Sequence, residues 1–150
     1  MIETDFMTQA LAEARAAEAR GEVPVGAVLV EAATGAVLAR AGNRVEELSD
    51  PTAHAEVLVI REAAAARCDV RLPQCDLCVT LEPCALCATA IAYARLRKVV
   101  FGAYDPKGGG VEHGPQIFDQ STIHHAPEVI GGVMETECAA ILKVFFAQRR

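Results

Sequence analysis

Two short segments of the sequence each combine the start of a predicted helix with side chains that bind metals. Residues 54–56 (His-Ala-Glu) open one helix, and residues 83–87 (Pro-Cys-Ala-Leu-Cys) open another directly after a predicted strand. Cys84 and Cys87 are three positions apart, so they share one face of their helix. They also lie in its first turn, where the helix dipole favours thiolate over thiol. A fold that uses both segments must bring the starts of two helices together.

The chemistry of these residues indicates a catalytic zinc site. His54, Cys84 and Cys87 offer one nitrogen and two sulfur ligands, which leaves the fourth tetrahedral position of a zinc ion for water. Zinc lowers the pKa of that water towards neutrality. Glu56 lies about 200° around an ideal helix from His54, so we expect it beside the metal rather than on it. A carboxylate in that place is suited to move protons between the water and a substrate.

The cysteines allow two other interpretations. Cys84 and Cys87 could be ordinary core residues, although a histidine and a glutamate upstream and a proline directly before the pair argue against it. Cys75 and Cys78 could join them in a structural zinc site. That pair falls in or beside a strand, where residues three apart point to opposite faces. We therefore predict that the remaining cysteines are packing residues: Cys68, Cys75, Cys78 and Cys138.

Length and composition set the frame for these motifs. A chain of 150 residues is expected to form a single domain, 1–150, with enough buried surface to fold without disulfides. No segment has the length and apolarity of a membrane span, and the acidic start does not resemble a secretory signal, so we expect a cytoplasmic protein with reduced thiols. The net charge is −6. An RNA partner would therefore need a local basic patch.

The pattern along the chain predicts alternating helices and strands. We expect a helix from Thr4 or Asp5 to about Arg20, then two strands across residues 21–39 with a turn at Thr34 and Gly35. Segment 42–51 is polar and loop-like. A second helix is expected from near Thr52, a strand over 76–81, a third helix with Pro83 in its first turn, and a strand over 97–103. A long irregular region covers 104–127, and a last helix begins near 135. This order predicts a three-layer α/β domain with a mixed sheet.

Several longer segments resemble the bacterial tRNA-specific adenosine deaminases. They are EVPVGAVLV (22–30), GNR (42–44), DPTAHAE (50–56), VTLEPCALCA (79–88), VVFGAYDPKGG (99–109) and ECAAILKVFFAQRR (137–150). The pattern H-x-E…P-C-x-x-C is also the known signature of zinc nucleobase deaminases. The resemblance implies a cytidine-deaminase-like α/β/α fold with a mixed five-stranded sheet. It also implies a homodimer with one zinc ion per chain, acting on the wobble adenosine of a tRNA anticodon stem-loop to give inosine.

The resemblance further implies a role for individual residues. Asn43, helped by the backbone of Ala55, would hold the target base, since an asparagine side chain both donates and accepts hydrogen bonds. Val25 and Pro24 would line the base pocket. Residues that would contact RNA are Asp105, Lys107, Arg149 and Arg150. Each has a simpler alternative: Asn43 as a turn residue, Val25 and Pro24 as strand core, Asp105 and Lys107 as a solvated loop, and the two arginines as a charged helix end.

Two other functions remain open at this stage. One is a deaminase of free bases or nucleosides, such as guanine or cytosine, which would use the same zinc site without RNA contacts. The other is a non-catalytic RNA-binding subunit, although such a subunit has no need of Glu56. Three histidines in the irregular region (His113, His124 and His125) are expected to be exposed loop residues rather than a second metal site.

Overall fold

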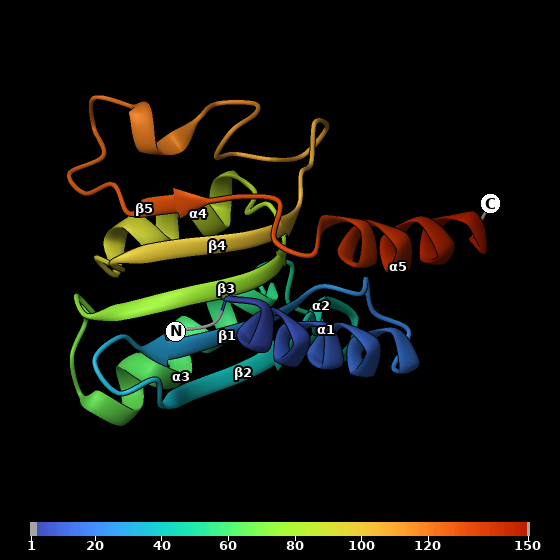
Figure 1. Ribbon diagram of the computed structural model, residues 1–150, viewed down its shortest axis with the longest axis horizontal. Helices are drawn as coiled ribbons and strands as arrows, with labels where there is room; N and C mark the ends of the chain where they lie inside the picture. Colours follow the sequence, from blue (N-terminus) through green and yellow to red (C-terminus); the bar gives the residue numbers. More distant parts are fainter. Residues whose placement is uncertain (1–2, 150) are drawn as a thin grey trace.

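The computed structural model describes residues 3–149, whose strands form one mixed sheet (Figure 1). The strands are β1 (Gly26–Glu31), β2 (Val37–Gly42), β3 (Cys75–Leu81), β4 (Lys98–Ala103) and β5 (Glu128–Ile130). Their order is β2-β1-β3-β4-β5, with β1 antiparallel to both β2 and β3, and with β4 and β5 parallel to β3 and β4. The expected mixed five-stranded sheet is confirmed. In this topology β2, β3 and β4 run in the same direction, so their C-terminal ends lie on the same side of the sheet.

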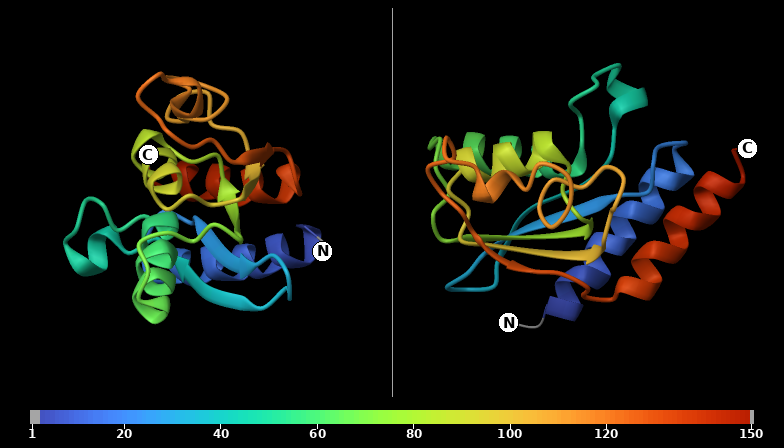
Figure 2. Two further views of the ribbon diagram at one scale, coloured as in Figure 1. Left: turned by 90° about the vertical axis from the view of Figure 1, so that its left-hand side faces the viewer. Right: turned by 90° about the horizontal axis from the view of Figure 1, so that it is seen from above.

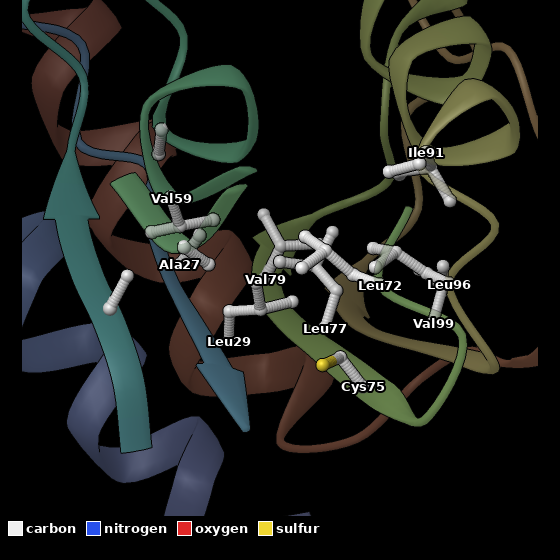
Figure 3. Close-up of a cluster of buried hydrophobic side chains, with 14 of the residues drawn as sticks. Ala27, Leu29, Val59, Leu72, Cys75, Leu77, Val79, Ile91, Leu96 and Val99 are labelled. Carbon is white, nitrogen blue, oxygen red and sulfur yellow. The ribbon is translucent and has the colours of Figure 1, made fainter. Parts of the chain in front are cut away.

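Helices cover both faces of the sheet, as the three-layer prediction requires (Figure 2). On one face α1 (Glu3–Ala19) and α5 (Glu135–Ala147) lie side by side and bury Met7, Leu11 and Cys138 against the strands. On the other face lie α3 (Ala55–Arg67) and α4 (Ala85–Tyr93). Figure 3 shows the apolar side chains between the sheet and α3 and α4. Because α3 and α4 bury apolar side chains against the sheet, the sheet fixes where the starts of these two helices lie.

The alternation of side chains along β3 explains most of the cysteines. Cys75 packs into the core beneath α3 and α4, whereas Cys78 lies on the opposite face, where its Sγ is 3.9 Å from Sδ of Met7. Cys138 is also fully buried. Cys68 is different, because it is exposed at the C-terminal end of α3 in a left-handed conformation with φ 52°. The prediction that Cys68 is a packing residue is therefore wrong: the helix ends there and turns the side chain outward.

Both metal-site helices begin later than the sequence pattern indicated. A turn held by the Asp50 carboxylate, which accepts from the Thr52 N–H at 2.8 Å, delays the start of α3 to Ala55. His54 is the residue before the first turn, in extended conformation. Likewise α4 begins at Ala85, so that Cys84 precedes the first turn and Pro83 lies outside the helix rather than within its first turn.

The connecting segments also contain structure that periodicity did not reveal. Segment 42–51 contains the single-turn helix α2 (Val45–Leu48), and the long region after β4 contains the short 3-10 helix η1 (Ile117–Asp119). The fifth strand was expected from family resemblance alone, because β5 has only three residues and gives no periodic signal. Among residues 3–149, no helix is both long enough and apolar enough to cross a membrane.

Candidate active site

The three predicted metal ligands meet where α3 and α4 begin. His54 stands directly before α3, and Cys84 stands directly before α4, with Cys87 one turn further on. Nδ1 of His54 lies 3.5 Å from Sγ of Cys84 and 3.4 Å from Sγ of Cys87. Within residues 3–149, these three side chains form the one group of histidine, cysteine and acidic residues placed to hold a metal ion.

The spacing of these atoms fits a tetrahedral ion. With a Zn–N bond of about 2.0–2.1 Å and a Zn–S bond of about 2.3 Å, the N···S edge of a tetrahedron is about 3.6 Å. The observed distances of 3.5 and 3.4 Å are close to that value. Two sulfur donors and one imidazole also favour zinc over magnesium or calcium, which prefer oxygen ligands. The donor set therefore fits a zinc ion with one position left for a fourth ligand.

Hydrogen bonds among the ligands prepare Cys84 to bind as a thiolate. The bond from the Cys87 thiol is the main reason that the pKa of Cys84 falls to about 4, and His54 lowers it further. The same bond raises the pKa of Cys87 well above its ordinary value. The contact with Cys84 raises the pKa of His54. A cation among these atoms would displace the shared protons, because cysteine binds metals as the thiolate.

Glu56 lies beside the ligands in the first turn of α3. Its side chain is buried, and burial is the main reason that its pKa rises to about 7, with the charge on Cys84 adding to the effect. A hydrogen-bonding contribution from the Cys87 side chain acts in the opposite direction and lowers that pKa. A carboxyl group whose pKa lies near neutrality can both accept and release a proton at working pH, which is what proton transfer in catalysis requires.

A cavity of about 640 Å³ opens above the ligands, large enough for a nucleobase. Its walls come from five parts of the chain: the segment before β1, the segment after β2, the end of β3 with Glu82 after it, the segment after β4, and the end of α5. In Figure 1, α5 extends past the sheet on the side where the chain leaves β4. The lining residues include His54, Glu56, Cys84, Val25, Asn43, Glu22, Glu82, Asp105, Gly108, Phe145, Phe146 and Arg149.

The residues expected to bind substrate divide into two groups. Val25, Asn43, Asp105 and Arg149 line the cavity. Pro24 and Ala55 are buried, and each is next in sequence to residues that line the cavity. Lys107 is exposed on the loop after β4 and lies outside the cavity wall. Arg150 is outside the described residues.

Asn43 is held by its neighbours at the end of β2. Its Nδ2 donates to Oε1 of Glu22 at 3.4 Å, its backbone N–H donates to the Val25 carbonyl at 3.0 Å, and its own carbonyl accepts from Arg20. The side chain is buried in the cavity wall with one amide hydrogen given to Glu22. This arrangement is more than a turn residue needs, because three separate bonds fix the position of the residue.

Two buried carboxylates in the cavity wall were not anticipated from the sequence. Glu22 accepts the N–H groups of Glu46 and Glu47 at the start of α2. Glu82, between β3 and α4, accepts from the loop after β4, and although burial alone would raise its pKa, hydrogen bonds led by the Asp105 N–H lower it overall. Both glutamates stand in apolar segments of the sequence, GEVPVG and VTLEPC, and charged residues in such segments are rarely buried without partners. That signal could have identified them.

Two of the three loop histidines are also better anchored than expected. His113 is partly buried and its Nδ1 lies 2.8 Å from Oε1 of Glu82. His125 is partly buried and bonds to the Leu96 carbonyl at 2.6 Å, whereas His124 is exposed. Neither contact involves a second group of metal-binding side chains among residues 3–149.

Comparison with known families agrees with this geometry. The family model described as the cytidine and deoxycytidylate deaminase zinc-binding region matches residues 2–103. That range contains His54, Glu56, Cys84 and Cys87. Fold and site together thus define a deaminase domain with a metal-binding centre.

Individual relatives narrow the class. The tRNA-specific adenosine deaminase of Agrobacterium fabrum is 56% identical over 98% of this chain and 95% of its own length. That of Bacillus subtilis is 46% identical over 97% and 89%. A solved structure from a study of A-to-I editing by tRNA:A34 deaminases at the wobble position is 57% identical, with a TM-score of 0.90 over 93% of this chain and 99% of that one. The chain belongs to the tRNA-specific adenosine deaminase family.

Proposed function

We propose that this protein is an enzyme that hydrolyses adenosine to inosine at the wobble position of a tRNA anticodon, using one zinc ion per chain. The observation that carries the proposal is the buried carboxyl group of Glu56 beside the His54, Cys84 and Cys87 cluster on the floor of a base-sized cavity. Relatives with 46–56% identity are named for this reaction. The reaction consumes one water molecule and releases one ammonia.

The protein's own residues divide the chemical work. His54, Cys84 and Cys87 would hold the zinc ion, which would lower the pKa of a water molecule towards neutrality. Glu56 takes a proton from the attacking water and gives it to N1 of the adenine ring. It then takes the proton of the new hydroxyl group at C6 and delivers it to the amino group, so that the C6–N bond breaks, ammonia leaves and the C6 carbonyl of inosine forms. The pKa of Glu56, raised to about 7 chiefly by burial, suits both the uptake and the release of that proton.

The cavity wall is proposed to hold the base for this reaction. The amide of Asn43 faces the cavity with one of its hydrogens already committed to Glu22, which leaves its remaining donor and its oxygen for a purine edge. Val25 supplies apolar contact. The backbone of Ala55, between a ligand and the shuttle, is proposed to assist. The nucleotide has to leave its stack to reach this depth, and an anticodon loop allows that at low cost.

RNA contacts are proposed at the mouth of the cavity. Asp105 and Arg149 line it, Lys107 is exposed on the same loop as Asp105, and Arg150 continues the end of α5 in sequence. The three cationic residues among them, Lys107, Arg149 and Arg150, would provide the local basic patch that a chain with a net charge of −6 needs. We also propose, from family resemblance, a homodimer in which residues 1–150 act as a single domain. A cytoplasmic location, where tRNA is used, is part of the same proposal.

A panel of substrates tests the proposal against a free-base deaminase. Purified zinc-loaded protein is given an anticodon stem-loop with adenosine at the wobble position, the same stem-loop with that adenosine moved by one nucleotide, and free adenosine, guanine and cytosine. We expect inosine in the first RNA alone, with KM rising steeply with salt because phosphate contacts release counterions. Ammonia from a free base with no reaction on RNA would overturn the tRNA assignment and keep the zinc chemistry.

A further inference from the structure

The loop after β4 converges on one buried carboxylate. Oε1 of Glu82 accepts the backbone N–H of Asp105 at 3.0 Å and lies 2.8 Å from Nδ1 of His113. Oε2 accepts the backbone N–H groups of Val111, Glu112 and His113 at 3.2, 2.9 and 3.1 Å. The Glu82 side chain is fully buried. Since a carboxylate offers about four lone-pair positions, these donors saturate it.

The loop is also pressed closely against the start of α4. The Gly110 N–H donates to the Pro83 carbonyl at 2.8 Å, directly before the metal ligand Cys84. A side chain at Gly109 would collide with Oε2 of Glu82, and one at Gly110 would come within 2.7 Å of the Ala85 nitrogen. This close approach accounts for the glycines of the sequence at these positions. The Glu82 carboxylate therefore occupies the space between the metal-binding helix and the loop.

The same loop forms one wall of the proposed substrate cavity. Asp105 and Gly108 line that cavity, and the Asp105 carboxylate is turned into the loop, accepting from the N–H groups of Lys107 and Gly108. The N–H of Asp105 is one of the groups that Glu82 holds. A change at Glu82 should therefore alter the cavity wall through Asp105, although the proposed chemistry gives Glu82 no part.

We propose that Glu82 is a positioning residue that holds the 105–113 loop in its RNA-binding shape before the substrate arrives. The inference rests on the proposed function, because the loop is assigned to RNA. A loop fixed in advance loses little conformational entropy on binding, so its anchor acts on substrate affinity. The catalytic step depends instead on Glu56 and the ligands, which are attached to α3 and α4. Loosening the loop should therefore raise KM and change kcat little.

The direct test is Glu82→Gln in the full-length zinc-loaded protein. The variant keeps the size of the side chain but turns an amide NH₂ towards backbone donors. We expect KM for the stem-loop RNA to rise about tenfold, which corresponds to the free energy of one hydrogen bond to a charged group. We expect kcat to change less than about threefold. Zinc content should stay at the wild-type level. Glu62→Gln is the matched control, because it removes the same charge from an exposed side chain of α3 that lies outside both the loop and the cavity wall, and it should leave KM unchanged.

A second pair of variants covers the case in which Glu82→Gln does not fold. His113→Ala removes one of the anchoring contacts, while His113→Asn keeps a donor near the position of Nδ1. KM should rise in the first and return towards wild type in the second. A role in overall stability alone would instead lower kcat and zinc content together at constant KM, in both variants, and that result would overturn the proposal.

Hydrogen exchange separates this inference from the proposed function. In the wild-type protein the N–H groups of residues 111–113 should exchange slowly with solvent. The same groups should exchange at least about tenfold faster in Glu82→Gln, or in His113→Ala if that variant is used. Unchanged exchange would overturn the anchoring role whatever the substrate is. If the wild-type protein made no inosine in RNA but exchange changed as expected, the tRNA assignment would fail and the anchoring of the loop would stand.

Discussion

The floor and the rim of the cavity are built in different ways. The floor, formed by His54, Glu56, Cys84 and Cys87, is attached to the first residues of α3 and α4, and both helices pack on the core. The rim consists of segments 43–50 and 105–113 and the end of α5. Each of the two rim segments is held by one buried carboxylate, Glu22 and Glu82 respectively. The proposed chemistry is thus placed at the starts of two packed helices, and the proposed substrate recognition on loops.

This difference has a thermodynamic consequence. The backbone of each floor residue is continuous with the start of a helix that is packed against the sheet. A change in the position of the residue therefore requires that helix to move. We expect the arrangement of the floor residues to be as stable as the core. The rim depends on a few hydrogen bonds to each carboxylate, so it opens at a smaller cost in free energy. Substitutions in the floor should therefore abolish turnover, whereas those in the rim should weaken binding by graded amounts.

The largest expected effect is the loss of a ligand from the floor. Cys84→Ser should remove zinc and reduce turnover below detection, because the thiolate is lost and the other two ligands alone hold the ion weakly. The melting temperature of the zinc-loaded sample should fall, since bound metal stabilises the folded state. Cys68→Ser, at an exposed position, is the control and should keep zinc and activity. Full zinc occupancy in Cys84→Ser would show that the ligand set is wrong.

A substitution between floor and rim should have an intermediate effect. Asn43→Ala removes the proposed base contact and the bond to Glu22, so kcat/KM on the stem-loop should fall between roughly tenfold and a hundredfold, as expected for one or two buried hydrogen bonds. Steady-state kinetics with matched zinc content measures it. Wild-type kcat/KM in this variant would exclude Asn43 from base recognition and leave it as a turn residue.

At the outer rim, single cations should have small but specific effects. Lys107→Ala and Arg149→Ala should each lower the slope of log Kd against log salt by about one if each contacts one phosphate. Lys143→Ala, an exposed lysine of α5 outside the cavity wall, should leave the slope unchanged. Equal slopes in all three variants would place the RNA elsewhere on the surface.

The smallest expected effect concerns the turn that leads to His54. Bonds from Thr52 are the main reason that the pKa of Asp50 lies below its ordinary value of 3.8. A lowered pKa means that the ionised group stabilises the folded state at neutral pH and that this contribution is lost as the pH falls through the folded-state value. Stability measured by urea unfolding should therefore depend less on pH below about 4 in Asp50→Asn than in wild type. An unchanged pH dependence would remove Asp50 as a source of acid sensitivity.

The sequence predicted the floor far better than the rim, for a physical reason. Metal ligands need fixed residue types at fixed helical spacing. Residues 54–56 and 83–87 therefore predict both a metal site and the contact between the starts of two helices. The strands of the sheet could be predicted equally well where they are long, as in β1 and β4. Helix starts were misplaced by a few residues, because the Asp50 turn and the extended Cys84 depend on local hydrogen bonds that periodicity does not show.

The structure of the rim could not be predicted from the sequence, because it depends on hydrogen bonds between segments that are far apart in the chain. Glu22 and Glu82 each accept N–H groups from segments more than twenty residues away in sequence, and no local pattern encodes such a pairing. α2 and β5 are too short to give a periodic signal. The wrong prediction for Cys68 has a similar origin, because the burial of a residue at the end of a helix depends on where the chain turns.

The central claim is that Glu56 performs proton transfer on the floor while the rest of the site binds metal and RNA without it. The most direct measurement is single-turnover inosine formation in the anticodon stem-loop by Glu56→Gln, with zinc content and RNA affinity determined on the same sample. The account predicts wild-type zinc and Kd with a rate reduced at least about a hundredfold, the usual contribution of a general acid–base group. A near-normal rate at full zinc occupancy would contradict it.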